Sequence, residues 1–193
     1  MLPLVLLDVD GVLNALARPP DARAWQDWQL GQAVADGRSW PIAWSPSVVD
    51  AVRGWRDRAD VQWLTTWGHN ANDSLRQLLD LPELPVAGTH QDGPVPQDLV
   101  PQGEPDAAPQ AHASIAPAAP DELTGRWWKF DVVRHLVRTQ PGRRLVWVDD
   151  DLDVDGPVGQ WMDREADCLL VVPFPVTGLV AADLAAVDAY LSA

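Results

Sequence analysis

Short apolar runs recur along the chain, separated by stretches in which apolar and polar positions alternate with a helical period. Four of these runs have the length of a buried strand, and they cover 2–7, 61–64, 145–148 and 169–172. Nearly continuous apolar runs of this length are typical of strands that are covered on both faces of a sheet. The pattern therefore predicts a sheet packed between two layers.

Helices are predicted between the strands. Ser45-Pro46 is a typical helix start, because serine accepts a bond from a free amide and proline fits the first helical position. Further helices are predicted at 72–79 and 129–137. A last helix has a buried stripe made of Val180, Leu184, Val187 and Leu191. The alternation predicts an α/β fold with a doubly wound, mostly parallel sheet, formed as one domain over 1–193.

Two segments depart from this alternation. The stretch 14–44 has no clean period, and we interpret it as a flap or small cap. It is unusually aromatic, with tryptophans that could line a site beneath it: Trp25, Trp28, Trp40 and Trp44. The stretch 86–125 is rich in Pro and Ala and has few large apolar residues. We expect a long loop insertion there, because so little apolar surface cannot offset the entropy lost on ordering.

Composition and charge narrow the classes of partner. The chain has 28 acidic and 14 basic side chains and a formal net charge of -14. Such a charge disfavours charge-driven binding to nucleic acid or anionic membranes. We find no apolar stretch near the roughly 20 residues that span a bilayer. Together with the single Cys168, these features lead us to expect a cytoplasmic protein without a membrane partner.

Polar side chains gather at the predicted carboxyl ends of the strands, where doubly wound sheets hold their sites. They are Asp8, Asp10, Thr65, Asp149, Asp150 and Asp151. Several carboxylates brought together repel one another unless a cation neutralises them, and Mg²⁺ prefers oxygen ligands and often shares them with a phosphate. Lys129 and a threonine hydroxyl would be suitable donors to phosphoryl oxygens.

The string Asp8-Val9-Asp10-Gly11-Val12 resembles the first motif of the haloacid dehalogenase-like (HAD) phosphohydrolase superfamily. The resemblance continues in order with Thr65 at a strand end, Lys129, and the acidic pair Asp149-Asp150. The finer pattern is similar to the HAD domain of Swiss-army-knife RNA repair proteins. It covers nearly the whole chain except 86–125, and it implies a Rossmann-like core.

The resemblance implies a role for each matching residue. Asp8 would be the nucleophile that forms an aspartyl phosphate, and Asp10 would protonate the leaving oxygen and then accept a proton from water. Thr65 and Lys129 would hold the transferring phosphoryl group. The implied Mg²⁺ ligands are Asp8, the backbone carbonyl of Asp10, Asp149 and Asp150, and we leave open which acids of the run Asp149, Asp150, Asp151 and Asp153 bind the ion. We leave open whether Thr65 or Thr66 binds phosphate, and we expect Trp67 and Trp128 to be walls of a substrate pocket.

Three functions stay open at this point. We favour a phosphatase that acts on a small phosphomonoester. A nucleic-acid end phosphatase is the first alternative, and it would need a basic track drawn from Arg126, Arg134, Arg138, Arg143 and Arg144. The second alternative is a catalytically silent phosphate-binding or docking module. Calcium binding is not expected: 151–156 begins like an EF-hand loop, but Met162 occupies the position that needs glutamate.

Overall fold

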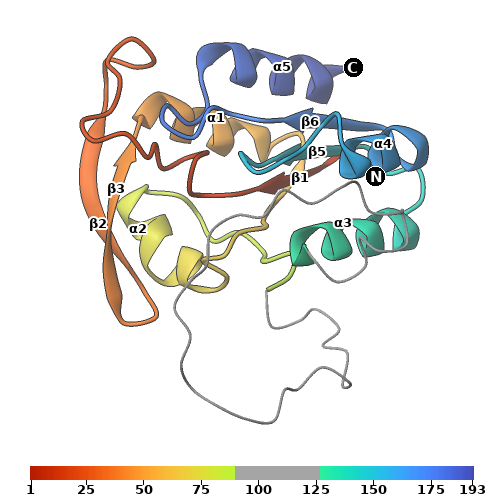
Figure 1. Ribbon diagram of the computed structural model, residues 1–193, viewed down its shortest axis with the longest axis horizontal. Helices are drawn as coiled ribbons and strands as arrows, with labels where there is room; N and C mark the ends of the chain where they lie inside the picture. Colours follow the sequence, from red (N-terminus) through yellow and green to blue (C-terminus); the bar gives the residue numbers. More distant parts are fainter. Residues whose placement is uncertain (90–126) are drawn as a thin grey trace, which may run out of the picture.

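A four-stranded parallel sheet forms the centre of the protein, in the order β4-β1-β5-β6 (Figure 1). The computed structural model describes residues 1–89 and 127–193. The strands are short and cover Leu4–Leu7 (β1), Asp60–Trp63 (β4), Leu145–Val148 (β5) and Cys168–Val171 (β6). Each lies within two residues of its predicted run, so the apolar pattern locates the sheet.

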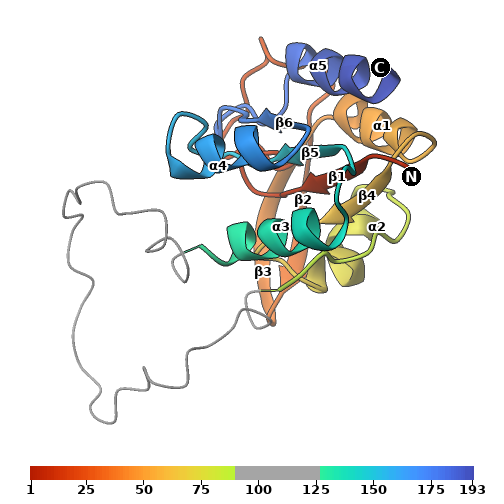
Figure 2. The same cartoon turned by 90° about the vertical axis from the view of Figure 1, so that its right-hand side faces the viewer.

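Helices cover both faces of the sheet, which confirms the doubly wound fold (Figure 2). One face carries α1 and α5, and the other carries α3 and α4. These helices cover Pro46–Trp55 (α1), Trp128–Thr139 (α3), Pro157–Glu165 (α4) and Ala181–Ser192 (α5). Alternate residues of β1 explain the two layers: Val5 and Leu7 join the apolar cluster beneath α1 and α5, whereas Leu4 and Leu6 join the cluster beneath α3 and α4.

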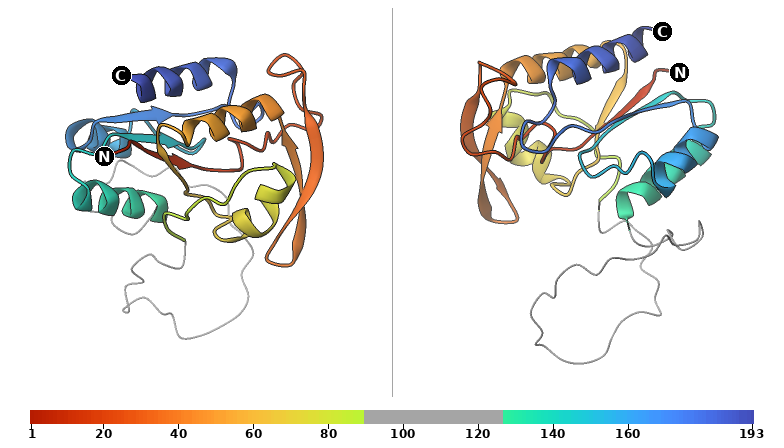
Figure 3. Two further views of the ribbon diagram at one scale, coloured as in Figure 1. Left: turned by 180° about the vertical axis from the view of Figure 1, so that it is seen from behind. Right: turned by 45° about the horizontal axis from the view of Figure 1, so that its top comes forward.

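The stretch predicted as a flap or small cap contains a β-hairpin. Its antiparallel strands are Gln29–Ala35 (β2) and Arg38–Trp44 (β3), joined by Asp36-Gly37. Both turn residues have positive φ, 50° and 72°, as a two-residue hairpin turn requires. The hairpin stands beside the segment after β4 (Figure 3). It is attached there because the Val34 amide donates to Ser74 Oγ at 2.7 Å.

Two further elements differ from the predictions. The helix predicted at 72–79 is a π-helical turn, Ala71–Leu75 (η1), followed by a short helix, Arg76–Leu78 (α2). Helix α4 was not predicted. Most of the predicted loop insertion, 90–125, lies outside the described residues. Among the helices of 1–89 and 127–193, none is long and apolar enough to span a membrane.

Candidate active site

The register of the sheet brings the polar strand ends to one edge, which we call the carboxyl edge. Leu7 of β1 is paired with Trp63 of β4 and with Val148 of β5. Asp8 and Asp149 therefore leave their strands at the same level, and the Asp8 amide still donates to the Val148 carbonyl at 3.0 Å. Thr65 follows two residues after Trp63. The predicted neighbourhood of these three residues is thus a direct result of strand register.

Lys129 lies in the first turn of α3 and connects two of these strand ends. Its Nζ atom is 2.5 Å from Asp8 Oδ2 and 2.7 Å from Asp149 Oδ2. All three side chains are buried, with residue exposures of 3% for Lys129, 5% for Asp8 and 0% for Asp149. Charges this deeply buried persist only when they are paired and hydrogen-bonded. Lys129 is therefore not an ordinary solvated lysine on a helix surface.

The carboxyl edge carries more negative charge than Lys129 neutralises. Oxygen atoms of Asp8, Asp149 and Asp150 lie within 4.8 Å of one another. Burial and the charge of Asp8 raise the pKa of Asp149 to about 6. Burial and the nearby acids Asp151 and Asp8 raise the pKa of Asp150 to about 6 as well. Repulsion of this kind is relieved by a bound cation.

The pKa directions of the buried pair follow from the same balance. Burial raises the pKa of Asp8, and this effect exceeds the opposing charge and hydrogen bond of Lys129. Burial alone would lower the pKa of Lys129, but the charges of Asp8 and Asp149 outweigh burial and raise it. Lys129 therefore stays an ammonium group. It has three N–H donors, and the two carboxylates account for two of them.

The donor set fits a hard divalent cation. Asp8, Asp149 and Asp150 offer only carboxylate oxygens, which Mg²⁺ prefers over nitrogen or sulfur. Gly11 makes room for the third of them, since a Cβ atom at Gly11 would lie 2.2 Å from the Asp150 carboxyl group. Gly11 also has a positive φ of 70°. A glycine at this position thus serves both the turn and the placement of Asp150.

Asp10 is held apart from that cluster. Its Oδ1 atom accepts from Asn14 Nδ2 at 2.6 Å, and its Oδ2 atom accepts from Trp67 Nε1 at 2.9 Å. Asn14 in turn accepts from the Ala43 amide of β3 at 2.9 Å. These two bonds fix the carboxyl group of Asp10. If Asp10 binds a metal ion, its backbone carbonyl is therefore the atom that does so. The contact between Asn14 and Asp10, four residues apart in the chain, was not predicted from the sequence.

The two threonines after β4 have different surroundings. Thr65 is 1% exposed, and its hydroxyl hydrogen-bonds to Asp8. Thr66 is exposed and borders a pocket next to Asp10. Of the two threonines, Thr65 is therefore the one beside Asp8. Trp128 packs partly buried against the apolar cluster beneath α3 and does not line that pocket.

The pocket next to Asp10 has a volume of about 240 Å³. It lies between the β2–β3 hairpin and the loop after β4, and it is lined by Asp10, Ala35, Asp36, Trp40, Thr66 and Trp67. We call it the Trp40 pocket. Of the four tryptophans predicted to line a site beneath the flap, Trp40 does so. The others pack elsewhere: for example, Trp25 donates to the Leu179 carbonyl at 2.8 Å.

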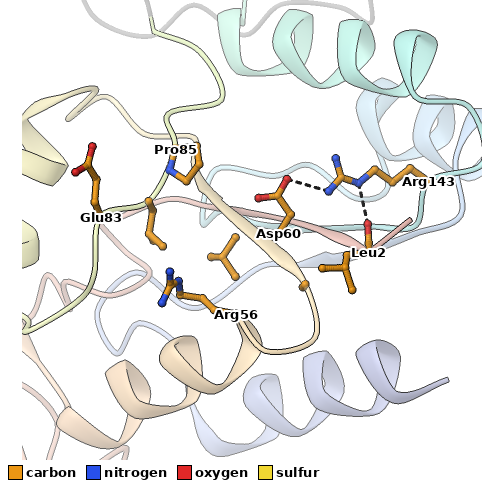
Figure 4. Close-up of a pocket in the computed structure, with 9 residues that line it drawn as sticks. Leu2, Arg56, Asp60, Glu83, Pro85 and Arg143 are labelled. Atoms are coloured by element: carbon orange, nitrogen blue, oxygen red, sulfur yellow. Dashed lines mark hydrogen bonds and ion pairs between the residues drawn. The ribbon is translucent and has the colours of Figure 1, made fainter.

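A larger pocket of about 590 Å³ lies at the opposite edge of the sheet, which we call the amino edge (Figure 4). Arg143 lines it and bonds to Asp60 at 3.0 Å and to the Leu2 carbonyl at 2.9 Å. Arg144 lies at the same end of β5. Two members of the predicted basic track are thus remote from Asp8, and Arg126 lies outside the described residues. The sequence prediction of a track leading to the site is not supported for Arg143 and Arg144.

Comparison with known proteins adds one match. The family model described as the HAD domain in Swiss Army Knife RNA repair proteins matches residues 4–184. No curated protein and no solved structure matches the chain significantly. The match spans both the sheet and the β2–β3 hairpin.

Proposed function

Because the chain belongs to the family of HAD domains in Swiss Army Knife RNA repair proteins, we propose that it is a Mg²⁺-dependent phosphohydrolase that cleaves a phosphomonoester. One observation carries the proposal: the buried Lys129 ammonium lies between the Asp8 and Asp149 carboxylates, with Asp150 within reach of both acids. A nucleophile, an electrophilic donor and a cation site meet there at one strand edge. This combination suits phosphoryl transfer.

Asp8 is the nucleophile in the first step. A carboxylate oxygen of Asp8 bonds to phosphorus while the bond from phosphorus to the leaving oxygen breaks, giving an aspartyl phosphate. Lys129 holds Oδ2 of Asp8, and the Val9 amide donates to Oδ1 at 2.6 Å, so the group is oriented before substrate arrives. This preorganisation reduces the entropy cost of reaching the reactive geometry.

Asp10 moves the protons in both steps. Its carboxyl group gives a proton to the leaving oxygen when the aspartyl phosphate forms. In the second step it takes a proton from the water that attacks phosphorus, which releases inorganic phosphate and frees Asp8. The bonds from Asn14 and Trp67 hold the carboxyl group in the place where both transfers occur.

The remaining groups stabilise charge on the phosphoryl oxygens. Lys129 has a third N–H donor beyond its bonds to Asp8 and Asp149, and the Thr65 hydroxyl lies beside Asp8, so both could donate to phosphoryl oxygens. Asp8, Asp149 and Asp150, with the Asp10 carbonyl, would hold the metal. When bound, Mg²⁺ would neutralise the carboxylates and the negative charge of the phosphoryl group.

A nucleic-acid end is a second candidate substrate, and the description of the matching family favours it. The net charge of -14 and the position of Arg143 at the amino edge favour a small substrate instead. We therefore keep the small phosphomonoester first. A silent phosphate-binding module is less consistent with the site, because such a protein needs neither a buried nucleophile nor a fixed second acid.

The test is release of inorganic phosphate from a panel of sugar phosphates, nucleotides and oligonucleotides with 3′- or 5′-phosphates. Each substrate is assayed with Mg²⁺ and with EDTA, using wild-type protein and Asp8→Asn side by side. We expect metal-dependent release from at least one class by the wild-type protein alone. Release that is equal in EDTA, or equal for Asp8→Asn, would contradict the proposal.

A further inference from the structure

The Trp40 pocket adjoins Asp10, the residue proposed to protonate the leaving group, and its chemistry restricts what that group is. We infer that the pocket binds the leaving group, and that this group is a single nucleoside without a second phosphate inside the pocket. The inference rests on the proposed function, which assigns the proton transfer to Asp10. The size of the pocket, its aromatic wall and its negative charge indicate which molecule it binds.

The position of Trp40 on the hairpin points to a stacking surface. Trp40 is paired with Ala33 across the hairpin, and Gly31 is paired with Ile42. Because paired residues two positions apart share a face, Trp40 lies on the same face as the buried Ala33 and Ile42. Trp40 is nevertheless 46% exposed. Trp40 remains exposed on this inward face because it borders the open pocket.

A second aromatic residue of the pocket wall, Trp67, is bonded to Asp10. Trp67 is 6% exposed and donates its indole N–H to Asp10, so its ring and the Asp10 carboxyl group form one unit. The exposed Thr66 hydroxyl lies beside it on the pocket wall. A planar group stacked on Trp40 would place its attached oxygen near Asp10, because both residues line the same pocket. An aromatic side chain can stack on any of the bases, because every base has a π-face.

The charge of the pocket excludes a second phosphate. Among the described residues that line it, none is Lys, Arg or His, whereas Asp10 and Asp36 are carboxylic acids. A phosphate inside the pocket would face like charges without a cation. Hydroxyl groups suit the same surface, because a carboxylate accepts their hydrogen bonds. One oxygen of Asp36 accepts from Asn70 at 3.1 Å, and its carboxylate has further acceptor capacity.

The size and the fixed position of the hairpin agree with one nucleoside. The volume of about 240 Å³ is below the range of about 300–1,000 Å³ for drug-sized ligands. The bonds from Val34 to Ser74 and from Asn70 to Asp36 attach the hairpin to the segment after β4. The pocket is therefore formed before the substrate binds. A nucleoside can come from a mononucleotide or from the end of an oligonucleotide, and the test separates these sources.

The experiment measures kcat/KM with Mg²⁺ for adenosine 3′-monophosphate, adenosine 5′-monophosphate, ribose 5-phosphate, adenosine 3′,5′-bisphosphate and a 3′-phosphorylated oligonucleotide. We expect the better mononucleotide to exceed ribose 5-phosphate by about 10-fold or more, from base stacking. The bisphosphate should be a poorer substrate than the better of the two adenosine mononucleotides. A preference for the oligonucleotide or the bisphosphate over both mononucleotides would overturn the claim that the pocket excludes a second phosphate.

The variants locate the preference. Trp40→Ala should lower kcat/KM for the mononucleotide about 10-fold and leave ribose 5-phosphate unchanged, and Trp40→Phe should restore most of the loss. Leu30→Ala is the matched control, because Leu30 is exposed on the outer face of the same hairpin. Equal rates on sugar phosphate and mononucleotide, or an equal loss on both in Trp40→Ala, would overturn the inference.

A binding measurement separates this inference from the proposed function. Calorimetric titration with adenosine, guanosine, cytidine and uridine tests the pocket without turnover. Binding that Trp40→Ala weakens about 10-fold, in a protein that releases no phosphate from any substrate, would support the pocket while the proposed function fails. Phosphate release without measurable binding of any nucleoside would support the function and overturn the pocket's occupant.

Discussion

The two edges of the sheet each carry a pocket lined by acids, yet their charges are arranged in opposite ways. At the amino edge, two arginines face two acids, and Arg143 is paired with Asp60 in a partly exposed ion pair. Arg56 and Glu83 there are exposed to water. At the carboxyl edge, three carboxylates share the single buried Lys129. The larger pocket is therefore the one with balanced charge.

The proposed site therefore lies where buried charge is unbalanced, and the larger pocket lies at the other edge. Balanced surface charges are solvated and cost little, so they arise without a function. Buried carboxylates in excess are unfavourable for folding, and their pKa values rise as a result. Such an arrangement is expected where a cation and a reacting group are bound.

The largest contrast is expected in catalysis. Asp8→Asn should lower kcat by about 1000-fold or more, because the amide cannot form the phosphoryl intermediate. Asp60→Asn at the amino edge should leave kcat within about twofold, since its pair is partly exposed. Phosphate release measures both, and circular dichroism checks that each variant is folded. Comparable losses in the two variants would remove Asp8 from its role.

The second largest contrast between the two edges is expected in the free energy of unfolding. Lys129→Met leaves Asp8 and Asp149 buried without their cation, so we expect a loss of about 3 kcal/mol in the free energy of unfolding. Arg143→Met breaks the pair with Asp60 and should cost about 1 kcal/mol or less. Urea unfolding at pH 7 in EDTA gives both values. A cost for Lys129→Met no greater than that of Arg143→Met would show that the buried pair contributes little.

Two glycines offer a matched test of the metal site. Gly11 and Gly142 have positive φ of 70° and 73°, so an alanine at either position should cost about 1 kcal/mol in backbone strain. A Cβ atom at Gly142 meets open space, whereas one at Gly11 meets the Asp150 carboxyl group. Calorimetric titration should therefore show Mg²⁺ affinity about 10-fold lower in Gly11→Ala and unchanged in Gly142→Ala. Equal affinities would place Asp150 outside the metal site.

The smallest effect is the pH dependence of Mg²⁺ stabilisation. In the folded, metal-free protein the pKa values of Asp149 and Asp150 are raised from 3.8 to about 6. The folded state therefore holds protons that the unfolded state has lost between about pH 4 and 6, and metal-free stability falls as pH rises through that window. Mg²⁺ binds the ionised carboxylates. The rise in Tm caused by Mg²⁺ should thus be larger at pH 7.5 than at pH 5.

Thermal unfolding with Mg²⁺ or EDTA at both pH values measures this effect. Asp149→Asn is the control, and it should reduce the rise in Tm at pH 7.5. A rise that is the same at pH 5 and pH 7.5 would contradict titration of these acids at the metal site.

The sequence predicted the carboxyl edge well because that edge follows from local patterns. Apolar runs located the strands, and parallel strands bring their carboxyl ends together, so Asp8, Thr65 and Asp149 could be placed without coordinates. The partnership of Lys129 with both acids could not be derived in the same way. It depends on how α3 packs against the sheet, and no local sequence pattern specifies that packing.

The hairpin and α4 were missed for different reasons. Asp36-Gly37 is a strong signal for a two-residue hairpin turn, but irregular apolar spacing on both sides obscured it. For α4, the proline at the first helical position and the apolar pair Val158 and Met162 were visible, but the acidic run before them was compared only with an EF-hand loop, which was rejected, and no helix was predicted. The Trp40 pocket could not be predicted, because it forms only where the hairpin packs beside η1, and that packing is a tertiary feature.

The most direct measurement of the central claim is chemical trapping of the intermediate. Wild-type protein turning over its best substrate with Mg²⁺ is quenched in acid, reduced with borohydride and digested, and mass spectrometry locates the modified residue. We predict a reduced acyl-phosphate product at Asp8 and none in Asp8→Asn. Modification at another residue, or rapid phosphate release with Asp8 unmodified at every quench time, would contradict the claim that Asp8 carries the phosphoryl group.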